Sequence, residues 1–251
     1  MKEDKKKIRK KPKKMQKYRQ NSKVKKFFFK IFFVVLAIIM SLAVAFLYAR
    51  YNDTQKAKEI TDNITMVPSK YTNKLLPTSN KDKIKNQTAE SLLRNQKKAI
   101  KLGYNNFPSG RVTIPSVGIN LPIFRGVNQY TLSLGAGKDH YIDAKMGSGN
   151  YVLAGHNMVW PKHILFDDLK DVKNGALINL YDSSKVYVYK VYQNKAISPY
   201  IHYDSKGIPD KNNPYRLPNK GEPAKVTLYS CTNSGKFRDV VQGHLIKTID
   251  K

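Results

Sequence analysis

The hydrophobic and polar positions divide the chain into three consecutive parts. The first is one apolar run, residues 31–49, in which Ser41 is the only clearly polar member. Residues 50–103 are polar, rich in Lys, Asn and Thr, and have no sustained apolar pattern. From residue 104 to residue 251, short β-rich runs alternate with turn residues. This pattern predicts a membrane-spanning helix, a polar stalk and one folded domain.

The apolar run is long enough to cross a bilayer as a helix. Its 19 residues would span roughly 28 Å at about 1.5 Å per residue, close to the hydrocarbon thickness. A basic tail precedes it, because residues 1–30 hold 15 Lys or Arg against Glu3 and Asp4, a net charge of +13. This asymmetry predicts a single-pass protein of the cell membrane with a cytoplasmic N-terminus and an extracellular folded domain.

A cleavable signal peptide is the alternative interpretation of the same run. Ala43-Val44-Ala45 resembles a signal-peptidase site. The apolar run, however, exceeds the usual ~7–15 residues of a signal core. We therefore favour an uncleaved anchor.

The net charge of +28 is of a size found in nucleic-acid-binding proteins, but it is unevenly distributed. Residues 104–251 contain 19 basic and 11 acidic residues, a net of +8, and nearly half of the whole excess lies in the tail 1–30. No RNA- or DNA-binding motif accompanies the basic stretch at residues 5–17. We expect no nucleic-acid partner and interpret the tail as a topological signal.

Residues 50–103 are expected to lift the folded domain off the membrane as a stalk. One helix is predicted within them. Thr88 is a suitable N-cap for the run 89–101, and Gly103 is a suitable residue to end it.

The last part of the chain, residues 104–251, contains seven runs with the alternation and the β-branched and aromatic content of strands. They are residues 111–114, 119–124, 151–154, 176–181, 186–193, 226–230 and 237–249. Asp182-Ser183-Ser184 predicts a hairpin turn, and a minor helix is expected at residues 165–169. Seven or eight short strands with one or two minor helices predict an all-β barrel or sandwich. The long connection 194–224 is rich in proline, and long ordered loops are commonly functional.

The only cysteine in the chain is Cys231, at the end of a predicted strand. Exported cysteines normally form disulfides, so a single one is an inert buried thiol, an intermolecular link or a nucleophile. A thiol attacks as the thiolate and needs a nearby base or positive charge, and the resulting oxyanion needs a donor. His156 lies just past a predicted strand, after Gly155, and Arg238 begins the last strand seven residues after Cys231. These three residues are the candidate catalytic group.

Metal and phosphate sites are not expected. His140, His163, His202 and His244 have no repeated spacing and no accompanying acidic cluster. The run Gly135-Ala136-Gly137-Lys138 lacks the remaining spacing of a phosphate loop and is predicted to be a turn.

The motifs around these residues resemble those of the sortase family. Thr227-Leu228-Tyr229-Ser230-Cys231 followed by Arg238 is similar to the cysteine and arginine motif, and Leu153-Ala154-Gly155-His156-Asn157 to the histidine motif. Residues 111–124, 165–175 and 240–249 resemble class A sortases in the same order. The resemblance covers about residues 104–251. It implies a closed eight-stranded β-barrel and a cysteine transpeptidase of Gram-positive cell surfaces.

The resemblance also implies roles for individual residues. Cys231 would attack the Thr–Gly carbonyl of a Leu-Pro-x-Thr-Gly sorting signal and form a thioacyl enzyme. His156 would act as general acid and base, and Arg238 would hold the substrate carbonyl and its oxyanion. The implied partners are surface proteins that carry the signal and an amine on a cell-wall precursor of the lipid II type. The positions that match the substrate groove of the family are Ala154, Pro199, Leu228, Tyr229 and Ser230.

Two departures from the family pattern bear on this hypothesis. Ser230 replaces the usual Thr before the cysteine but keeps a hydroxyl. Residues 126–149 contain only Asp139 and Asp143 as carboxylates, which is too few for the calcium site of some class A members, so no cofactor is expected.

No apolar C-terminal segment and no aromatic Asp-Pro lid are seen, which argues against the pilus-polymerising class. The alternatives are a sortase of another class with a different signal, or an inactive membrane-tethered binding barrel.

Overall fold

The structure is a computed structural model. It describes residues 13–65, 84, 87–139, 144–158, 163–200, 205, 213–232 and 234–251, with side chains from residue 24 onward. The chain forms two compact units, Met1–Ala49 and Arg50–Lys251. Each unit is considered by itself.

Helix α1 (Lys13–Asp62) contains the predicted apolar run. Among the described residues, its portion Val24–Asp62 is the one helix long and apolar enough to cross a membrane. Large apolar side chains between Phe27 and Leu47 are exposed around the helix. A helix that is apolar on all sides and at least 18 residues long has the length and composition of a membrane span.

The described parts of residues 50–103, the end of α1 and helix α2, pack in the same compact unit as the barrel. The compact second unit begins at Arg50, and the end of α1 packs within it: Ala57 and Thr61 are buried. Helix α2 (Ala89–Lys101) bridges this end of α1 to the short helix α3 (Gln129–Leu134). The amide of Gln96 donates to the carbonyls of Ala57 and Ser133, both at 3.0 Å. The hydrophobic pattern did not predict this packing because small and polar residues make the contacts.

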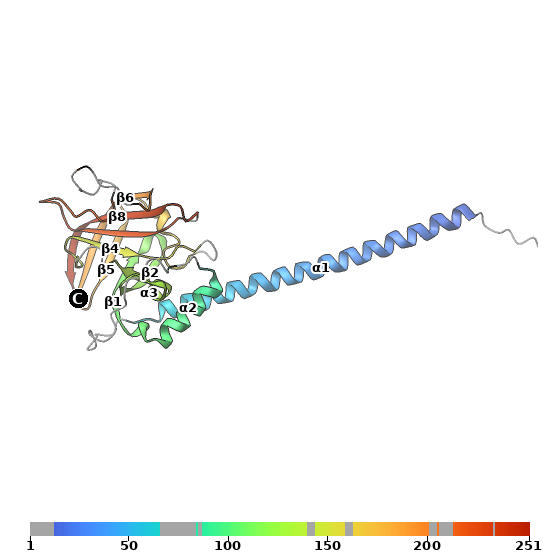
Figure 1. The fold of residues 1–251 in the computed structure, drawn as a ribbon, viewed down its shortest axis with the longest axis horizontal. Coiled ribbons are helices and arrows are strands. Elements are labelled where there is room, and N and C mark those ends of the chain that lie inside the picture. Colours follow the sequence, from blue (N-terminus) through green and yellow to red (C-terminus); the bar gives the residue numbers. More distant parts are fainter. Residues whose placement is uncertain are drawn as a thin grey trace, which may run out of the picture. The chain divides into compact units, whose positions relative to one another are not determined.

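Helix α2 begins and ends where the sequence predicts. The Thr88 Oγ1 accepts from the backbone N–H of Ser91 at 3.3 Å, and the Ser91 Oγ accepts from the N–H of Thr88 at 2.8 Å. This reciprocal pair is a capping box. Gly103 follows the helix with a φ of 80°, a left-handed conformation that glycine adopts without strain. The helix lies beside α3 (Figure 1).

Eight strands close into a barrel, as predicted (Figure 1). They are β1 (Pro108–Ile114), β2 (Ile119–Arg125), β3 (Ala136–Lys138), β4 (Asn150–Ala154), β5 (Leu177–Tyr181), β6 (Lys185–Ile197), β7 (Lys225–Cys231) and β8 (Arg238–Asp250). Their order around the barrel is β1-β2-β3-β4-β7-β8-β6-β5, and β5 pairs with β1 to close it. The β2–β3 and β4–β7 pairs are parallel, and the remaining pairs are antiparallel.

Two local predictions were wrong. The expected turn at residues 135–138 contains strand β3. Gly137 allows it to pack closely, since a Cβ at this residue would lie 2.6 Å from the carbonyl oxygen of Gly126. The expected helix at residues 165–169 is a series of turns followed by a 3₁₀ turn, Leu169–Asp171. Leu165 has a φ of 57°, which is incompatible with a right-handed helix. The hairpin turn at Asp182 is confirmed, since its Oδ1 accepts from the N–H groups of Ser184 and Lys185.

The two faces of the barrel wall have different tasks. On β7, Val226 and Leu228 point into the apolar core, so Thr227, Tyr229 and Cys231 point to the outer face. Outer-face residues are nevertheless buried where other segments cover them, and Thr227 is one of these. Polar groups on this face therefore need partners within the protein.

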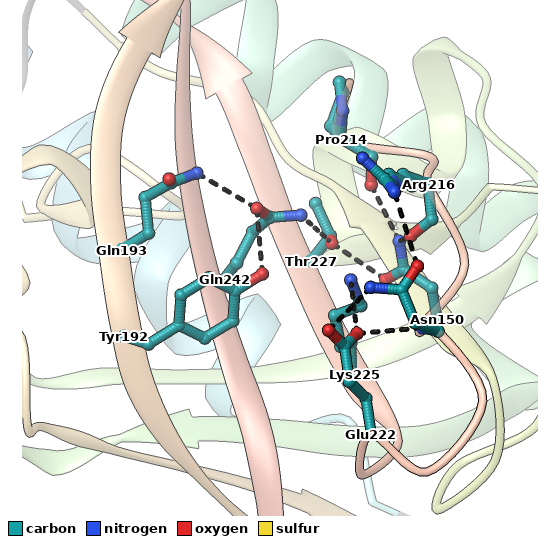
Figure 2. A network of polar contacts seen from close by, with 10 residues as sticks. Asn150, Tyr192, Gln193, Pro214, Arg216, Glu222, Lys225, Thr227 and Gln242 are labelled. Atoms are coloured by element: carbon teal, nitrogen blue, oxygen red, sulfur yellow. Dashed lines mark hydrogen bonds and ion pairs between the residues drawn. The ribbon is translucent and has the colours of Figure 1, made fainter. Parts of the chain in front are cut away.

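A ladder of hydrogen bonds provides these partners across four neighbouring strands (Figure 2). The Gln193 amide of β6 donates to the Gln242 Oε1 of β8 at 3.0 Å, and the Gln242 amide donates to the Thr227 Oγ1 of β7 at 3.0 Å. Thr227 donates in turn to the Asn150 Oδ1 of β4 at 2.8 Å. The Asn150 amide then reaches the loop between β6 and β7, where it donates to a carbonyl at 2.8 Å. The ladder ties residues 214–216 of this loop to the wall of the barrel.

Replacing Thr227 by Val is predicted to destabilise the second unit. The change preserves side-chain volume but leaves the Gln242 amide and the Asn150 Oδ1 without Thr227, and an unmet buried polar group costs about 1–3 kcal/mol. Chemical denaturation of the full chain in detergent, followed by the fluorescence of the single tryptophan, Trp160, measures the loss. Thr248→Val, on the exposed end of β8, is the matched control and should change the unfolding free energy little. Equal stability of the two variants would contradict the prediction.

Candidate active site

A cleft of about 670 Å³ lies at one end of the outer face formed by β4, β7 and β8. Its lining includes the three candidate catalytic residues, His156, Cys231 and Arg238. These residues are separated by up to 82 positions in the sequence. The pairing of the strands explains why they lie around one cleft.

Parallel pairing places Cys231 and His156 at the same end of two neighbouring strands. Ala154 is the register partner of Tyr229, and both side chains belong to one apolar cluster on the outer face. His156 lies two residues after Ala154, and Cys231 lies two residues after Tyr229. The two-residue period of strands therefore places both side chains on the same face. The pairing continues past the strand end, because the Gly155 N–H donates to the Tyr229 carbonyl at 3.0 Å. The Asn157 amide also donates to the backbone carbonyl of Cys231, at 2.7 Å.

Arg238 reaches the same end of the cleft from β8. It is the register partner of Cys231 at the start of the β7–β8 hairpin. Its Nη1 donates to the backbone carbonyls of Gly235 and Phe237, at 3.2 and 3.0 Å. These bonds hold the guanidinium at the hairpin, and the group has further N–H donors for a substrate oxygen.

Gly155 allows the histidine to be positioned in this way. A Cβ at this residue would lie 2.3 Å from the ring of Phe166, so a larger residue would displace the chain. Phe166 itself donates its N–H to the carbonyl of His156 at 3.0 Å. The Phe166 ring therefore restricts Gly155, and the Phe166 N–H holds the backbone of His156.

His156 is held neutral in a buried position. His156 is 6% exposed, and this burial lowers the pKa of its imidazole to about 4. The amide nitrogen of Gln87 lies 2.8 Å from its Nε2. With this amide as the donor, Nε2 accepts and the ring proton is on Nδ1. The same amide donates to the Ser133 Oγ at 2.9 Å, which links Gln87 to α3.

A family model described as the sortase domain matches residues 112–246, more than half of the chain. The chain belongs to the sortase family. It is 36% identical to the sortase A of Bacillus anthracis over 141 residues, which are 55% of this chain and 60% of that protein. It is 32% identical to the sortase A of Streptococcus agalactiae serotype III (strain NEM316) over 170 residues, 66% of this chain and 62% of that protein. The match thus spans less than two thirds of the length of either relative.

A solved structure is also similar to this sortase. The crystal structure of Listeria monocytogenes sortase A is 32% identical to it, with a TM-score of 0.48. The similarity covers 57% of this chain and 90% of the other.

The structure brings together four of the five predicted substrate-groove residues. Ala154, Pro199, Tyr229 and Ser230 line the cleft of this sortase. Leu228 does not: it is fully buried in the barrel core, because it alternates with Tyr229 along β7 and points to the opposite face. Leu228 is therefore a core residue that packs inside the barrel.

Several cleft residues carry no recognisable sequence signal. Val127 and Leu132 form the apolar floor with Ala154 and Tyr229, and Ile84 packs against them. Two further residues without a motif contact the catalytic or lining groups described above: Gln87 and Tyr215. The proline-rich character of the connection 194–224 gave the only indication, since Tyr215 belongs to it.

The donor set for a metal ion is small in the described part of the chain. No group of three or more His, Cys, Asp or Glu side chains there is placed to hold a metal ion. Asp139 accepts hydrogen bonds from two tyrosine hydroxyls through one oxygen, Oδ2. Asp143, the other carboxylate considered from the sequence, lies outside the described residues.

Asp167 is a second buried titratable group, next to the loop that carries His156. Burial raises the pKa of its carboxyl to about 7, although the N–H of Met158 donates to its Oδ1. Its Oδ2 is buried and has no hydrogen-bond partner among the described residues. Asp167 and His156 thus have pKa values shifted in opposite directions by the same cause, loss of solvation.

These opposite shifts predict two contributions to the pH dependence of stability that largely cancel in the wild type. Between about pH 4 and 6.5 the unfolded chain binds an extra proton at His156, so His156 makes stability fall as the pH falls. Asp167 binds its extra proton in the folded state up to about pH 7, so its contribution rises as the pH falls. Asp167→Asn removes the second effect. We expect its unfolding free energy to decrease from pH 6.5 to pH 4.5 by up to about 1.4 kcal/mol per pH unit more than that of the wild type.

Denaturation of the full chain in detergent at several pH values tests this expectation. Asp250→Asn, at an exposed carboxylate that pairs with Lys185, is the control and should follow the wild type. If Asp167→Asn also follows the wild type, the opposing contributions do not exist.

Proposed function

We propose that this sortase is a membrane-anchored cysteine transpeptidase of the class A type. It cleaves a Leu-Pro-x-Thr-Gly signal between Thr and Gly and transfers the Thr acyl group, with the protein that precedes it, to an amine of a cell-wall precursor. The observation that carries the proposal is the parallel β4–β7 register, which places His156 and Cys231 at one end of a cleft that Arg238 also lines. Membership of the sortase family supports it.

The proposed reaction begins in the form of the enzyme in which Cys231 is a thiolate and His156 is an imidazolium, a minor form because burial lowers the pKa of His156. The sulfur of Cys231 forms a bond to the Thr carbonyl carbon, and the carbonyl electrons move to the oxygen, where the guanidinium of Arg238 stabilises the negative charge. As the tetrahedral intermediate collapses, the C–N bond to Gly breaks and imidazolium His156 gives its proton to the leaving amine. The product of this half-reaction is a thioester between Cys231 and the Thr carbonyl.

An acceptor amine completes the transfer. It attacks the thioester carbonyl, neutral His156 takes its proton, and the Cys231 thiolate leaves. A new amide bond replaces the one that was broken. The apolar floor of the cleft, made by Val127, Leu132, Ala154 and Tyr229, suits the Leu-Pro half of the signal.

The cellular arrangement belongs to the same proposal. Helix α1 anchors the protein, with the basic tail in the cytoplasm and the unit Arg50–Lys251 outside. The supporting observations are the charge of +13 in residues 1–30 and the apolar helix that follows. In this orientation the cleft faces the side on which the cell wall and its precursors lie.

The catalytic assignment predicts distinct losses for three variants. Full-length protein in detergent is given a Leu-Pro-x-Thr-Gly peptide with and without an added amine, and products are identified by mass spectrometry. The wild type should cleave after Thr and form the amine-linked product. Cys231→Ala should abolish both reactions, and His156→Ala and Arg238→Ala should each lower kcat/KM at least about 100-fold. Arg238→Lys should recover little, because a lysine lacks the planar set of donors.

Lys236→Ala, at an exposed position of the same hairpin, is the control. Cleavage that survives in Cys231→Ala would show that the mechanism is wrong. A wild type that binds the peptide without turnover would indicate an inactive binding barrel. A wild type that processes only other signals would indicate a sortase of another class.

The contact between Gln87 and His156 predicts a variant with higher activity. To protonate the leaving amine, the imidazole must itself be protonated, and its buried position beside Gln87 opposes this. Gln87→Ala opens the histidine to solvent, so its pKa should rise toward the ordinary 6.5. We expect kcat/KM to increase several-fold and the acidic limb of the pH–rate profile to move to higher pH. Lys97→Ala, on the exposed face of α2, is the control. A loss of activity in Gln87→Ala would instead show that Gln87 orients the ring for catalysis.

A further inference from the structure

A buried carboxylate behind the cleft holds two of the aromatic rings that line it. Asp139 directly follows β3 and is 1% exposed. Its Oδ2 accepts a hydrogen bond from the Tyr229 hydroxyl at 2.7 Å and another from the Tyr215 hydroxyl at 2.8 Å. Tyr229 belongs to β7 and Tyr215 to the loop between β6 and β7. One oxygen atom therefore connects three segments that are distant in the sequence.

Both hydroxyls are bound to this carboxylate as donors. Burial raises the pKa of Tyr229 well above its usual value, and the neighbouring Tyr215 and Asp139 raise it further. The phenol consequently keeps its proton and can donate it. A carboxylate away from water needs such donors, because desolvating a charge without hydrogen bonds costs several kcal/mol.

The two rings form adjoining walls of the cleft. Their centroids are 6.3 Å apart and their planes are inclined by 72°, an edge-to-face arrangement. Tyr229 continues the apolar floor made by Val127, Leu132 and Ala154. Both tyrosines line the cleft that contains Cys231.

The loop that carries Tyr215 is fixed at its backbone as well. The Asn150 amide donates to the carbonyl of Pro214 at 2.8 Å and to that of Arg216 at 3.0 Å, one residue to either side of Tyr215 (Figure 2). Asn150 is fully buried and held by the ladder that begins at β6. Asn150 therefore sets the position of the loop, and Asp139 sets the orientation of the ring that the loop presents.

A residue of the chain itself shows what this surface accepts. Ile84 packs against the cluster Val127, Leu132 and Ala154, which Tyr229 also contacts. It is one of the residues that line the cleft. The floor thus accommodates a branched aliphatic side chain on the same apolar cluster against which Tyr229 packs.

We propose that Asp139 is a positioning residue that sets the specificity of the cleft for peptide substrates. By holding the Tyr229 and Tyr215 rings, it preorganises a site for a branched aliphatic side chain upstream of the scissile bond. The inference rests on the proposed transpeptidase function and assigns a determinant of substrate choice to a residue outside the catalytic group. Because the site acts on binding, losing it raises KM and leaves the chemistry at Cys231 unchanged.

The test compares two peptides, Leu-Pro-x-Thr-Gly and Ala-Pro-x-Thr-Gly, with the full chain in detergent. In Asp139→Ala we expect KM for the Leu peptide to rise about tenfold, the size of effect of one lost hydrogen bond to a charged group, with kcat within about twofold. The ratio of kcat/KM between the Leu and Ala peptides should fall by about the same factor. Alkylation of Cys231 by a small thiol reagent should keep its wild-type rate.

Conservative variants separate positioning from general stability. Asp139→Asn keeps an acceptor oxygen and should recover most of the discrimination between the peptides. Tyr215→Phe keeps the ring but loses one hydroxyl, so we expect a rise in KM of about threefold for the Leu peptide. Asp250→Asn, remote from the cleft on the exposed end of β8, should behave as the wild type.

The outcomes that overturn the inference are distinct from a failure of the proposed function. If the wild type processes the Leu peptide but Asp139→Ala keeps its KM and its discrimination, the inference is wrong and the function stands. The same holds if Asp139→Ala lowers kcat equally for both peptides. If Asp139→Ala does not fold, Tyr215→Phe decides, and an unchanged KM overturns the inference. If the wild type processes neither peptide, the proposed function fails, and this inference fails with it.

Discussion

The arrangement of the candidate active site depends on one pairing, the parallel register of β4 and β7. Because the two strands run in the same direction, the residues that follow both of them emerge at the same end of the barrel. An antiparallel pair with the same residues would separate His156 from Cys231 by the length of the strands. Parallel neighbours also require a long crossover, and here the chain between Ala154 and Lys225 includes β5, β6 and the loop that contributes Tyr215. The same constraint therefore gathers the reactive groups and supplies part of the cleft that surrounds them.

The two faces of the wall divide the remaining work between them. Side chains that point inward form the apolar core, and those that point outward on β4, β7 and β8 form first the polar ladder and then the floor of the cleft. The outer face is covered near Asn150 and Thr227, so its amides and hydroxyls are bonded to one another or to backbone carbonyls. Specific polar bonding at one end of the strands thus fixes the geometry of an apolar surface at the other end.

Much of this organisation was predictable from the sequence, and the exceptions have physical reasons. Strands such as 186–193 and the capped helix after Thr88 follow from local periodicity and turn chemistry, which the sequence carries directly. The candidate catalytic residues were found through motifs, but their convergence depends on a register that no local pattern encodes. Strand β3 is only three residues long and contains Gly137, so it resembled a turn. Leu228 was assigned to the cleft although the two-residue period places it in the core. Gln87 and Asp139 act through contacts with residues distant in sequence, and such contacts leave no local signature.

The position of Ile84 and Gln87 has a consequence for competition within the cleft. Both residues belong to the segment just before α2, so they are covalently tethered to the domain whose cleft they contact. A tethered group acts at an effective concentration that is commonly in the millimolar range for a short flexible connection. To displace Ile84 and Gln87, a free peptide needs a product of concentration and affinity comparable to that of the tethered segment. In the proposed membrane-anchored arrangement, a substrate confined to the same membrane surface would itself be concentrated by that confinement, so the tether would favour such substrates over peptides free in solution.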